Sequence, residues 1–328
     1  MVKAISLLSG GLDSILATKL ILDEGVLVEA VTFWMPFVSS SAAVDISSQV
    51  SCEFNIKHHI IDLRDSVDYL KIVRKPTYGY GKNLNPCIDC HIFMLKKAKE
   101  LMREKRASFI ITGEVLGERP MSQRREILNL IDEKTSLKGL VVRPLSARLL
   151  EPTEPEMKGW LKRDDLLDIQ GRSRRRQLDL AREMNIKHYL SPAGGCLLTD
   201  REFSKKVKDL IECGQLTIDN VALLKVGRHF RLDSEQKLVV GRDKSENKKI
   251  EGLRRDDDII LKPERIPGPT ALYRGRFNLN LINLSGRILA SYTKTKDIVR
   301  IRFYKRSNIV NYMEVKPLDR EVLDKYRI

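Results

Sequence analysis

Ser9-Gly10-Gly11-Leu12-Asp13-Ser14, together with the largely apolar run Ala4–Leu8 before it, decides the fold of this chain. The run is short and ends at a glycine turn, which predicts a buried strand. Apolar residues then recur at the spacing of one helix face until Gly25, a typical helix end; they are Leu12, Ile15, Leu16, Leu20 and Ile21. The stretch therefore predicts a strand, a two-glycine turn and a helix.

Such a corner is suited to binding phosphate. The glycines let the backbone come close to an anion, and the free N–H groups at the start of the helix point toward it. Asp13 and Ser14 fall on the first helical turn, where a carboxylate can hold Mg²⁺ and a hydroxyl can reach an oxygen. The lysine of the Walker pattern is absent. The plain alternative is an ordinary strand–turn–helix corner with a chance pair of glycines.

The same residues resemble the SGGxDS motif of the PP-loop ATP pyrophosphatases. The resemblance implies that Ser9, Gly10, Gly11, Asp13 and Ser14 bind ATP, with Asp13 also catalytic through Mg²⁺. Enzymes of this family adenylate a substrate oxygen and release pyrophosphate.

Alternating strand and helix patterns continue along the first half of the chain. Strands are expected over 26–34, 58–63 and 108–113, and a helix over 42–54. This alternation predicts an α/β fold with a doubly wound parallel sheet, whose ligands bind at the carboxyl ends of the strands. We expect this first domain to span residues 1–215.

Composition and charge narrow the function classes. The chain has 328 residues, 42% hydrophobic and 31% charged, which is typical of a globular protein. With no membrane-length apolar run and no signal peptide, we expect a cytoplasmic protein, and five cysteines that are reduced or bind metal. The net charge is +15, of which +10 follows residue 215 (25 Lys and Arg against 15 Asp and Glu). This excess favours an anionic polymer such as nucleic acid over thermal adaptation, which raises both signs of charge.

A cysteine pair begins the next informative stretch. Cys87 and Cys90 form a CxxC at the start of a helix, after the Gly- and Asn-rich loop 78–85. A helix N-terminus lowers thiol pKa values, so the pair can chelate a metal or form a redox dithiol. Residues 85–90 resemble the Asn-Pro-x-x-x-Cys segment of tRNA 2-thiouridylases.

A second family segment follows the strand at 108–113. Residues 112–123 resemble the Thr-Gly-Glu-Ser-Leu-Gly-Gln-Val-Ala-Ser-Gln stretch of tRNA 4-thiouridine synthetases, and Val141–Leu145 resembles a strand with Arg-Pro-Leu in that family. The resemblance implies nucleotide contacts for Gly113, Glu114 and Gln123. The chain departs from the family pattern at residues 118–121.

A third cysteine lies far along the chain. Cys196 follows a Ser-Pro-Ala-Gly-Gly turn, which predicts a thiol on exposed, amide-rich backbone. PP-loop thiolases share a CxxC with a distant third cysteine, and this resemblance implies that Cys87, Cys90 and Cys196 are catalytic and bind a 4Fe–4S cluster. Zinc with His91 as a further ligand, and a cluster-free persulfide relay, stay open as alternatives. Cys52 and Cys213 lie in helical apolar patterns and are expected in the core.

Two basic regions are candidate RNA contacts. Arg172, Arg174, Arg175 and Arg176 cluster before a helix. From residue 216 the pattern favours a smaller, strand-rich α+β domain over 216–328, with strands expected over 223–232, 237–243, 279–282, 287–292, 298–304 and 309–315. Residues 239–247 resemble the RNA-binding module of NFACT proteins. In this domain the candidate nucleic-acid contacts are Arg228, Arg242, Arg302 and Lys305.

These patterns together predict a tRNA-thiolating enzyme. A uridine carbonyl oxygen would be adenylated with ATP and Mg²⁺, pyrophosphate would leave, and sulfur from sulfide or a cysteine desulfurase would enter through the cluster. The longer match favours 4-thiouridine, at position 8 of the tRNA elbow, over 2-thiouridine. A protein of another class, a non-catalytic RNA-binding factor that senses ATP, also fits. No membrane partner is expected, and the sequence leaves the oligomeric state open.

Overall fold

The computed structural model describes residues 2–38, 40–190, 195–305 and 310–328. Its internal contacts divide the chain into two compact units at Thr199 and Asp200, ahead of the boundary expected at 215/216. The segment between the two boundaries joins the second unit because Asp209 forms ion pairs with Arg231 and Lys237 there. Each unit is described on its own. None of the helices in the described ranges is long and apolar enough to cross a bilayer.

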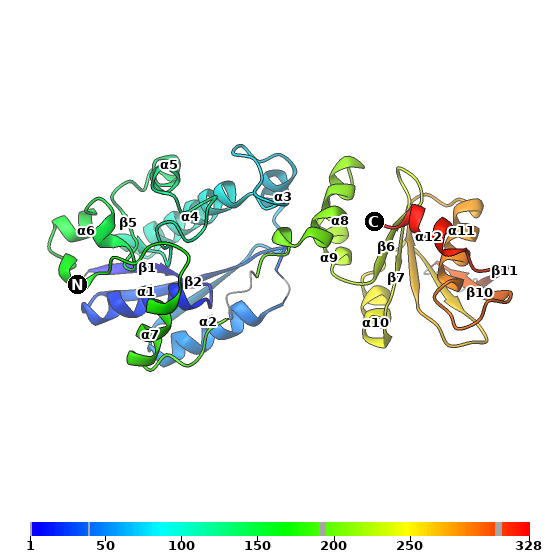
Figure 1. Cartoon of the computed structure of the whole chain (residues 1–328), viewed down its shortest axis with the longest axis horizontal. Coiled ribbons are helices and arrows are strands. Elements are labelled where there is room, and N and C mark those ends of the chain that lie inside the picture. Colours follow the sequence, from blue (N-terminus) through cyan, green and yellow to red (C-terminus); the bar gives the residue numbers. More distant parts are fainter. Residues whose placement is uncertain (1, 39, 191–194, 306–309) are drawn as a thin grey trace. The chain divides into compact units, whose positions relative to one another are not determined.

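The first unit is built on a parallel five-stranded sheet (Figure 1). Its strands are β1 (Lys3–Leu7), β2 (Leu27–Trp34), β3 (Lys57–Asp62), β4 (Phe109–Ile111) and β5 (Val141–Val142). Its α-helices are α1 (Leu12–Asp23), α2 (Ala42–Glu53), α3 (Val67–Arg74), α4 (Cys87–Glu104), α5 (Arg125–Thr135), α6 (Glu154–Met157) and α7 (Arg175–Glu183). The expected doubly wound α/β fold is confirmed.

Helices cover both faces of this sheet. Successive side chains along each strand point to opposite faces, and both faces are apolar. On one side Ala4 and Phe109 pack with Leu16 of α1 and Ala181 of α7. On the other side Ile5, Val31 and Ile110 pack with helices α4 and α5. Figure 1 shows α1, α2 and α7 on one side of the sheet and α4 and α5 on the other.

The strand order places a ligand site. The order is β3-β2-β1-β4-β5. Strands β2 and β3 are added on one side of β1 and strands β4 and β5 on the other, so the strand order reverses between β1 and β4. In doubly wound sheets, ligands bind at such a reversal, beyond the carboxyl ends of the strands. The loop Ser9–Ser14 follows β1, and Thr112–Glu114 follow β4.

The second unit contains an antiparallel six-stranded sheet in the order β11-β10-β8-β9-β7-β6. Its strands are β6 (Arg228–Arg231), β7 (Lys237–Val240), β8 (Ile259–Pro263), β9 (Ala271–Arg274), β10 (Val299–Tyr304) and β11 (Val310–Val315). Its α-helices are α8 (Arg201–Glu212), α9 (Ile218–Leu224), α10 (Lys244–Gly252), α11 (Leu279–Ala290) and α12 (Arg320–Tyr326).

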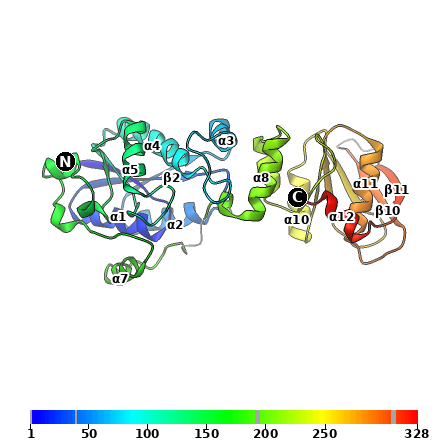
Figure 2. The ribbon, with the colours of Figure 1, turned by 45° about the horizontal axis from the view of Figure 1, so that its top comes forward.

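Helices also lie on both faces of the second sheet. Ile282 and Leu289 of α11 pack on Ile301 of β10, and Leu223 of α9 and Ile250 of α10 pack with Ile260 of β8 on the opposite face. Figure 2 shows α10 and α11 on either side of the strands.

Two strands predicted in this unit are wrong. Residues 279–282 and 287–292 were expected as strands, but most of both stretches lies in the single helix α11. Asn278 caps this helix by accepting hydrogen bonds from the N–H groups of Asn280 and Leu281. The apolar positions follow a 3.6-residue period once the two stretches are joined, and this period is hidden when each is considered alone. The strand expected to begin at residue 309 starts outside the described residues.

Candidate nucleotide and sulfur-transfer site

The loop between β1 and α1 is held in one conformation by its own serines. Ser14 Oγ accepts a hydrogen bond from Ser9 N at 3.1 Å and donates one to Gly11 O at 2.8 Å. Gly10 has a φ of +73°, and a Cβ there would lie 2.9 Å from the carbonyl oxygen of Ala43. The loop therefore needs glycine for its backbone conformation and for its close approach to α2.

The segment after β4 packs directly on this loop. A Cβ on Gly113 would lie 2.4 Å from Ser14 N and 2.6 Å from Ser14 Cα. These atoms are backbone and cannot swing away, so only glycine fits between β4 and the start of α1. The two stretches that motif comparison had assigned to one site are thus in contact.

A cavity of about 570 Å³ opens over this contact, within the size range of small-molecule sites. One part of its wall is apolar and includes Leu7, Val31, Phe33, Met35 and Leu95. The other part is polar and includes Ser9, Asp13, Ser14, Gln123 and Arg174. An apolar pocket beside a polar, amide-bearing loop is an arrangement that can hold a base and a phosphate chain.

Asp13 and Arg174 face each other in the polar part. Arg174 Nη2 donates to Asp13 Oδ2 at 3.1 Å, and both side chains are more than four-fifths buried. Burial raises the pKa of Asp13, and the charges of Arg174 and Arg119 oppose that rise. Arg174 therefore lines this cavity, a position that the sequence, which suggests an RNA contact, did not indicate.

Several polar atoms around this pair have no partner among the described residues. They are Asp13 Oδ1, Arg174 Nε and both amide atoms of Gln177, and all are buried. A buried polar atom without a hydrogen bond is costly, so the arrangement fits a polar ligand that would complete it. The carboxylate oxygen suits Mg²⁺, and the guanidinium suits phosphate.

Glu114 fixes the floor of the cavity through buried charges. It contacts Arg143 at 2.9 Å and His91 Nδ1 at 2.7 Å, and Arg143 also pairs with Asp132 at 2.7 Å. Burial alone would raise the pKa of Glu114, but Arg143 and His91 lower it to about 2. Glu114 is therefore ionised, and both of its carboxylate oxygens already have protein partners. Gln123 Oε1 accepts a hydrogen bond from Arg119 N at 3.0 Å.

The three candidate cysteines come together near Tyr69. Tyr69 donates its hydroxyl to Cys90 Sγ at 3.4 Å, and Asn85 donates to Cys87 Sγ at 3.2 Å. Cys196 pairs with Val38 in an isolated bridge beyond the end of β2. In addition to burial, Cys87 and Cys196 both raise the pKa of Cys90, and Cys87 raises the pKa of Cys196, so the three thiols lie near one another although Cys196 is distant in the sequence. Residues 191–194 of the predicted turn lie outside the described part of the chain.

The ionisation of these thiols differs from the expectation. Burial raises the pKa of Cys90 to about 12 and that of Cys196 to about 11, so both are protonated near neutral pH. The helix N-terminus does not compensate for lost hydration at these positions. Among the described residues no group of three His, Cys, Asp or Glu side chains is arranged to hold a single metal ion, and His91 Nδ1 is already bonded to Glu114.

The prediction that Cys52 and Cys213 belong to the core is wrong. Cys52 is exposed and Cys213 is half-buried, since each stands at the end of a helix on its solvent side.

Most other predicted RNA contacts lie at surfaces. Arg172 and Arg175 are exposed, and Arg176 pairs with Asp168 at 2.8 Å. In the second unit, Arg228 lies over the Tyr292 ring and Arg242 donates to Gly227 O. Arg302 is exposed on β10, and Lys305 lies 3.9 Å from Asp257.

Sequence analysis missed three side chains that shape the site. Arg119 lies in the stretch that departs from the family pattern, and Gln177 and Tyr69 lie on helices with no motif. These side chains contact residues that are distant in the sequence, so local patterns do not reveal them. Only Gln177 lies beside a noticeable pattern, the basic cluster around Arg174.

Family models match two parts of the chain. Residues 1–148 match the model described as thiamine biosynthesis protein (ThiI), and residues 227–327 match the NFACT protein RNA-binding domain. Both resemblances drawn from the motifs are therefore confirmed.

Individual relatives agree with the first match. A probable tRNA sulfurtransferase of Geobacillus thermodenitrificans is 33% identical over 148 residues, covering 44% of this chain and 34% of the relative. A tRNA-specific 2-thiouridylase of Prochlorococcus marinus is 34% identical over 92 residues, covering 26% of this chain and 22% of the relative. The chain thus spans about a third or less of the length of these relatives. Among solved structures, a 4-thiouridine synthetase in complex with RNA and ATP is 24% identical, with a TM-score of 0.37 over 68% of this chain and 52% of that one.

Proposed function

Because residues 1–148 form a ThiI-like PP-loop sulfurtransferase domain and residues 227–327 form an NFACT RNA-binding domain, we propose that this chain is an ATP-dependent tRNA sulfurtransferase. The observation that carries the proposal is that the cavity and the cysteine group adjoin each other in the first unit. His91 and Gly195 line this cavity, and each is adjacent in the sequence to a cysteine of the thiol group, since Cys90 precedes His91 and Cys196 follows Gly195. Activation and sulfur transfer can therefore take place at adjoining positions.

ATP is proposed to lie in the cavity with its base against the apolar wall and its phosphates at the Ser9–Ser14 loop. Ser9, Gly10, Gly11 and Ser14 would offer amides and hydroxyls, and Asp13 would hold Mg²⁺. Arg174 would leave Asp13 and neutralise phosphate charge. The unpartnered Asp13 Oδ1 and Arg174 Nε support this assignment.

The chemistry proceeds in two balanced steps. A uridine carbonyl oxygen attacks the α-phosphorus, the bond to the β-phosphate breaks, and pyrophosphate leaves as the base loses its N3 proton. Hydrosulfide then adds to the same ring carbon, AMP leaves with the original oxygen, and the sulfur proton returns to N3. The product is a thiocarbonyl. We propose 4-thiouridine as the product because residues 112–123 resemble the 4-thiouridine synthetase stretch over a longer segment than residues 85–90 resemble the 2-thiouridylase segment.

Cys87, Cys90 and Cys196 are proposed to deliver the sulfur, and a 4Fe–4S cluster is the group we propose they hold. Their thiol chemistry fits such a cluster, since they are neighbours and the cluster spreads its ligands over separate irons. When bound, the cluster would supply an open iron for sulfide. Cys90 and Cys196 would each have to release a proton to bind it.

RNA contact is proposed for the open part of the second sheet. Helices α9 and α10 cover one end of this face, while Arg302 of β10 stands exposed between Lys262 of β8 and Tyr312 of β11. Lys262, Arg302 and Tyr312 form a basic and aromatic row that suits phosphate contacts and base stacking.

The deciding experiment combines purified full-length chain, unmodified tRNA, ATP, Mg²⁺ and sulfide under anaerobic conditions. Pyrophosphate release and nucleoside mass analysis should both be positive, with 4-thiouridine as the product. Pyrophosphate release without thiolated nucleoside would reject sulfur transfer from sulfide through the cluster, and neither signal would favour the ATP-sensing RNA-binding factor. Iron and sulfide content of the same sample distinguishes the cluster from a persulfide relay.

A further inference from the structure

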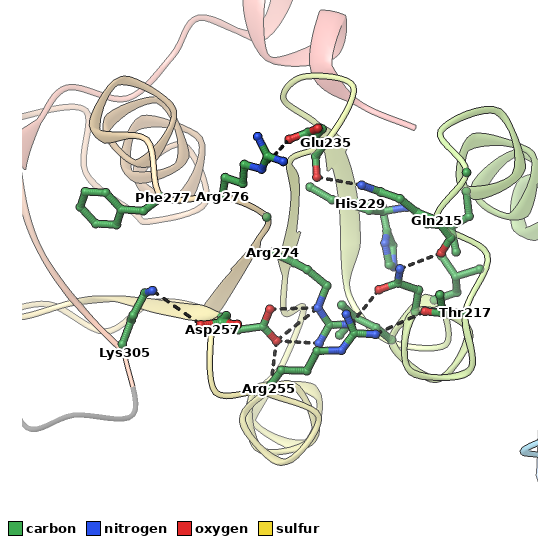
Figure 3. A pocket seen from close by; sticks show the side chains of 18 residues that line it. Gln215, Thr217, His229, Glu235, Arg255, Asp257, Arg274, Arg276, Phe277 and Lys305 are labelled. Atoms are coloured by element: carbon green, nitrogen blue, oxygen red, sulfur yellow. Dashed lines mark hydrogen bonds and ion pairs between the residues drawn. The ribbon is translucent and has the colours of Figure 1, made fainter.

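The second unit contains a cavity of about 600 Å³ that the proposed chemistry does not use. Figure 3 shows its lining, with Gln215, Thr217 and His229 on one side and Arg276, Phe277 and Lys305 on the other. Much of the wall, including Leu210, Leu223 and Leu224, comes from α8 and α9, which precede the stretch that matches the RNA-binding family. The cavity is therefore formed jointly by the RNA-binding domain and the helices before it.

Two loosely paired cations line this cavity. Its lining carries five cations and three carboxylates; the cations are Lys237, Arg255, Arg274, Arg276 and Lys305. Arg274 and Lys237 are consumed by short buried ion pairs with Asp258 and Asp209. Arg276 and Lys305 are more exposed, and their carboxylate partners lie at 3.4 and 3.9 Å. These two cations can therefore turn toward an anion at little cost.

The buried end presents an unused hydrogen-bond acceptor. His229 is 2% exposed, and its Nε2 lies 2.9 Å from Val226 O, which can only accept. Nε2 therefore carries the proton, and Nδ1 is a lone-pair acceptor with no partner among the described residues. Burial lowers the pKa of His229 well below its usual value, so the ring stays neutral. A ligand with an N–H or O–H donor would satisfy Nδ1.

We propose that this cavity binds one unpaired nucleotide, with the base inside, a donor of the base on His229 Nδ1, and the phosphate at Arg276 and Lys305. The half-exposed Phe277 gives an aromatic face on which a base can stack, and the volume suits a nucleotide. The inference rests on the proposed RNA binding and extends it, since it gives the domain a preference for single-stranded over paired RNA. The nucleotide can belong to an RNA strand or be free nucleoside monophosphate.

The test measures binding of the full chain to a labelled single-stranded RNA, to its duplex, and to the same strand with abasic positions. The intact strand should bind about tenfold or more tightly than the abasic one. Phe277→Ala and His229→Leu should narrow this difference, while His229→Asn, which keeps an acceptor, should preserve it. Arg276→Ala should weaken the binding of both RNA strands. Arg320 is a similarly exposed arginine on α12, so Arg320→Ala is the charge-matched control.

Competition by free nucleoside monophosphate separates the two sources. If the monophosphate displaces the strand at similar concentration, the cavity is a mononucleotide site; if it does not, the strand is the ligand. Equal binding of intact and abasic strands, or an unchanged difference in Phe277→Ala and in a folded His229→Leu, would overturn the inference. If the chain does not thiolate tRNA but still binds the intact strand more tightly than the abasic one, the result counts against the proposed function and leaves this inference standing.

Discussion

Arg174 reaches from the start of α7 to Asp13 at the start of α1, with its Nη2 3.1 Å from the Asp13 carboxylate. The contact joins the glycine loop to a segment beyond residue 148, where the family match ends. It places a guanidinium beside the carboxylate that is proposed to hold Mg²⁺. Binding of Mg²⁺ and ATP would therefore have to compete with an ion pair that already exists.

Replacing Arg174 by alanine should impair ATP chemistry and change its pH dependence. Without the guanidinium, the pKa of Asp13 rises further, because Arg174 opposes the effect of burial. A raised carboxyl pKa means that Asp13 becomes protonated at higher pH, so the acid limb of the pH profile should move upward. Pyrophosphate release should also fall about a hundredfold as phosphate stabilisation is lost. Exposed Arg172→Ala is the control, and an unmoved acid limb in Arg174→Ala would exclude this role.

Glu114→Gln should destabilise the first unit at neutral pH. The change leaves Arg143 buried with one partner fewer, which costs about 3 to 5 kcal/mol when a buried pair is broken. Because the folded-state pKa of Glu114 is lowered to about 2 from 4.5, its contribution is complete above pH 4.5 and disappears as the pH falls toward 2. The mutant and the wild type should therefore converge in stability at low pH.

Tryptophan fluorescence can follow this prediction because both tryptophans, Trp34 and Trp160, lie in the first unit. Denaturant unfolding at pH 7 and at pH 3 gives the two stabilities. Glu100→Gln, in an exposed pair with Lys97, should change the free energy of unfolding by under about 1 kcal/mol. A stability difference between Glu114→Gln and the wild type that is as large at pH 3 as at pH 7 would contradict the charge argument.

The sequence predicted the first sheet well because its strands are short apolar runs separated by clear helical periods. The family resemblance assigned Gly113 and the Ser9–Ser14 loop to one nucleotide site, and the two segments lie in contact. Nothing in the sequence indicated that Arg174 lines the cavity, because a basic cluster looks the same whether one arginine points to solvent or into a cavity. The prediction of strands within α11 was wrong because each stretch was too short. Leu and Ile occur in both helices and strands, and only the periodicity of apolar residues over the full length of α11 distinguishes the two.

Gly113→Ala should disrupt the loop after β1. The added Cβ would lie 2.4 Å from Ser14 N, and neither backbone segment can move without breaking the sheet edge. We expect loss of ATP binding and a destabilisation of a few kcal/mol, of the size found for overpacked cores. Gly252→Ala is the matched control, since nothing lies within 4 Å of its Cβ position in α10 and alanine favours helix by about 1 kcal/mol. Retained ATP affinity in Gly113→Ala would show that the contact is less tight than described.

The buried thiols should resist alkylation until the solution is strongly alkaline. Thiolate is the reactive form, so a pKa of about 12 for Cys90 and about 11 for Cys196 leaves little of it at pH 7.5. Against an ordinary thiol with a pKa of about 8.5, Cys90 should react about a thousandfold more slowly, and exposed Cys52 should be modified first. Tyr69→Phe should slow Cys90 further, because the hydroxyl of Tyr69 stabilises the thiolate.

Iodoacetamide labelling of the metal-free, reduced chain followed by peptide mass analysis gives the rate at each cysteine. The rate at Cys196 should rise about tenfold per pH unit up to about pH 11. Modification of Cys90 as fast as Cys52 at pH 7.5 would mean that its thiol is not desolvated. In that case a low-pKa dithiol, able to attack a sulfur donor directly, would replace the neutral ligand thiols inferred from the structure.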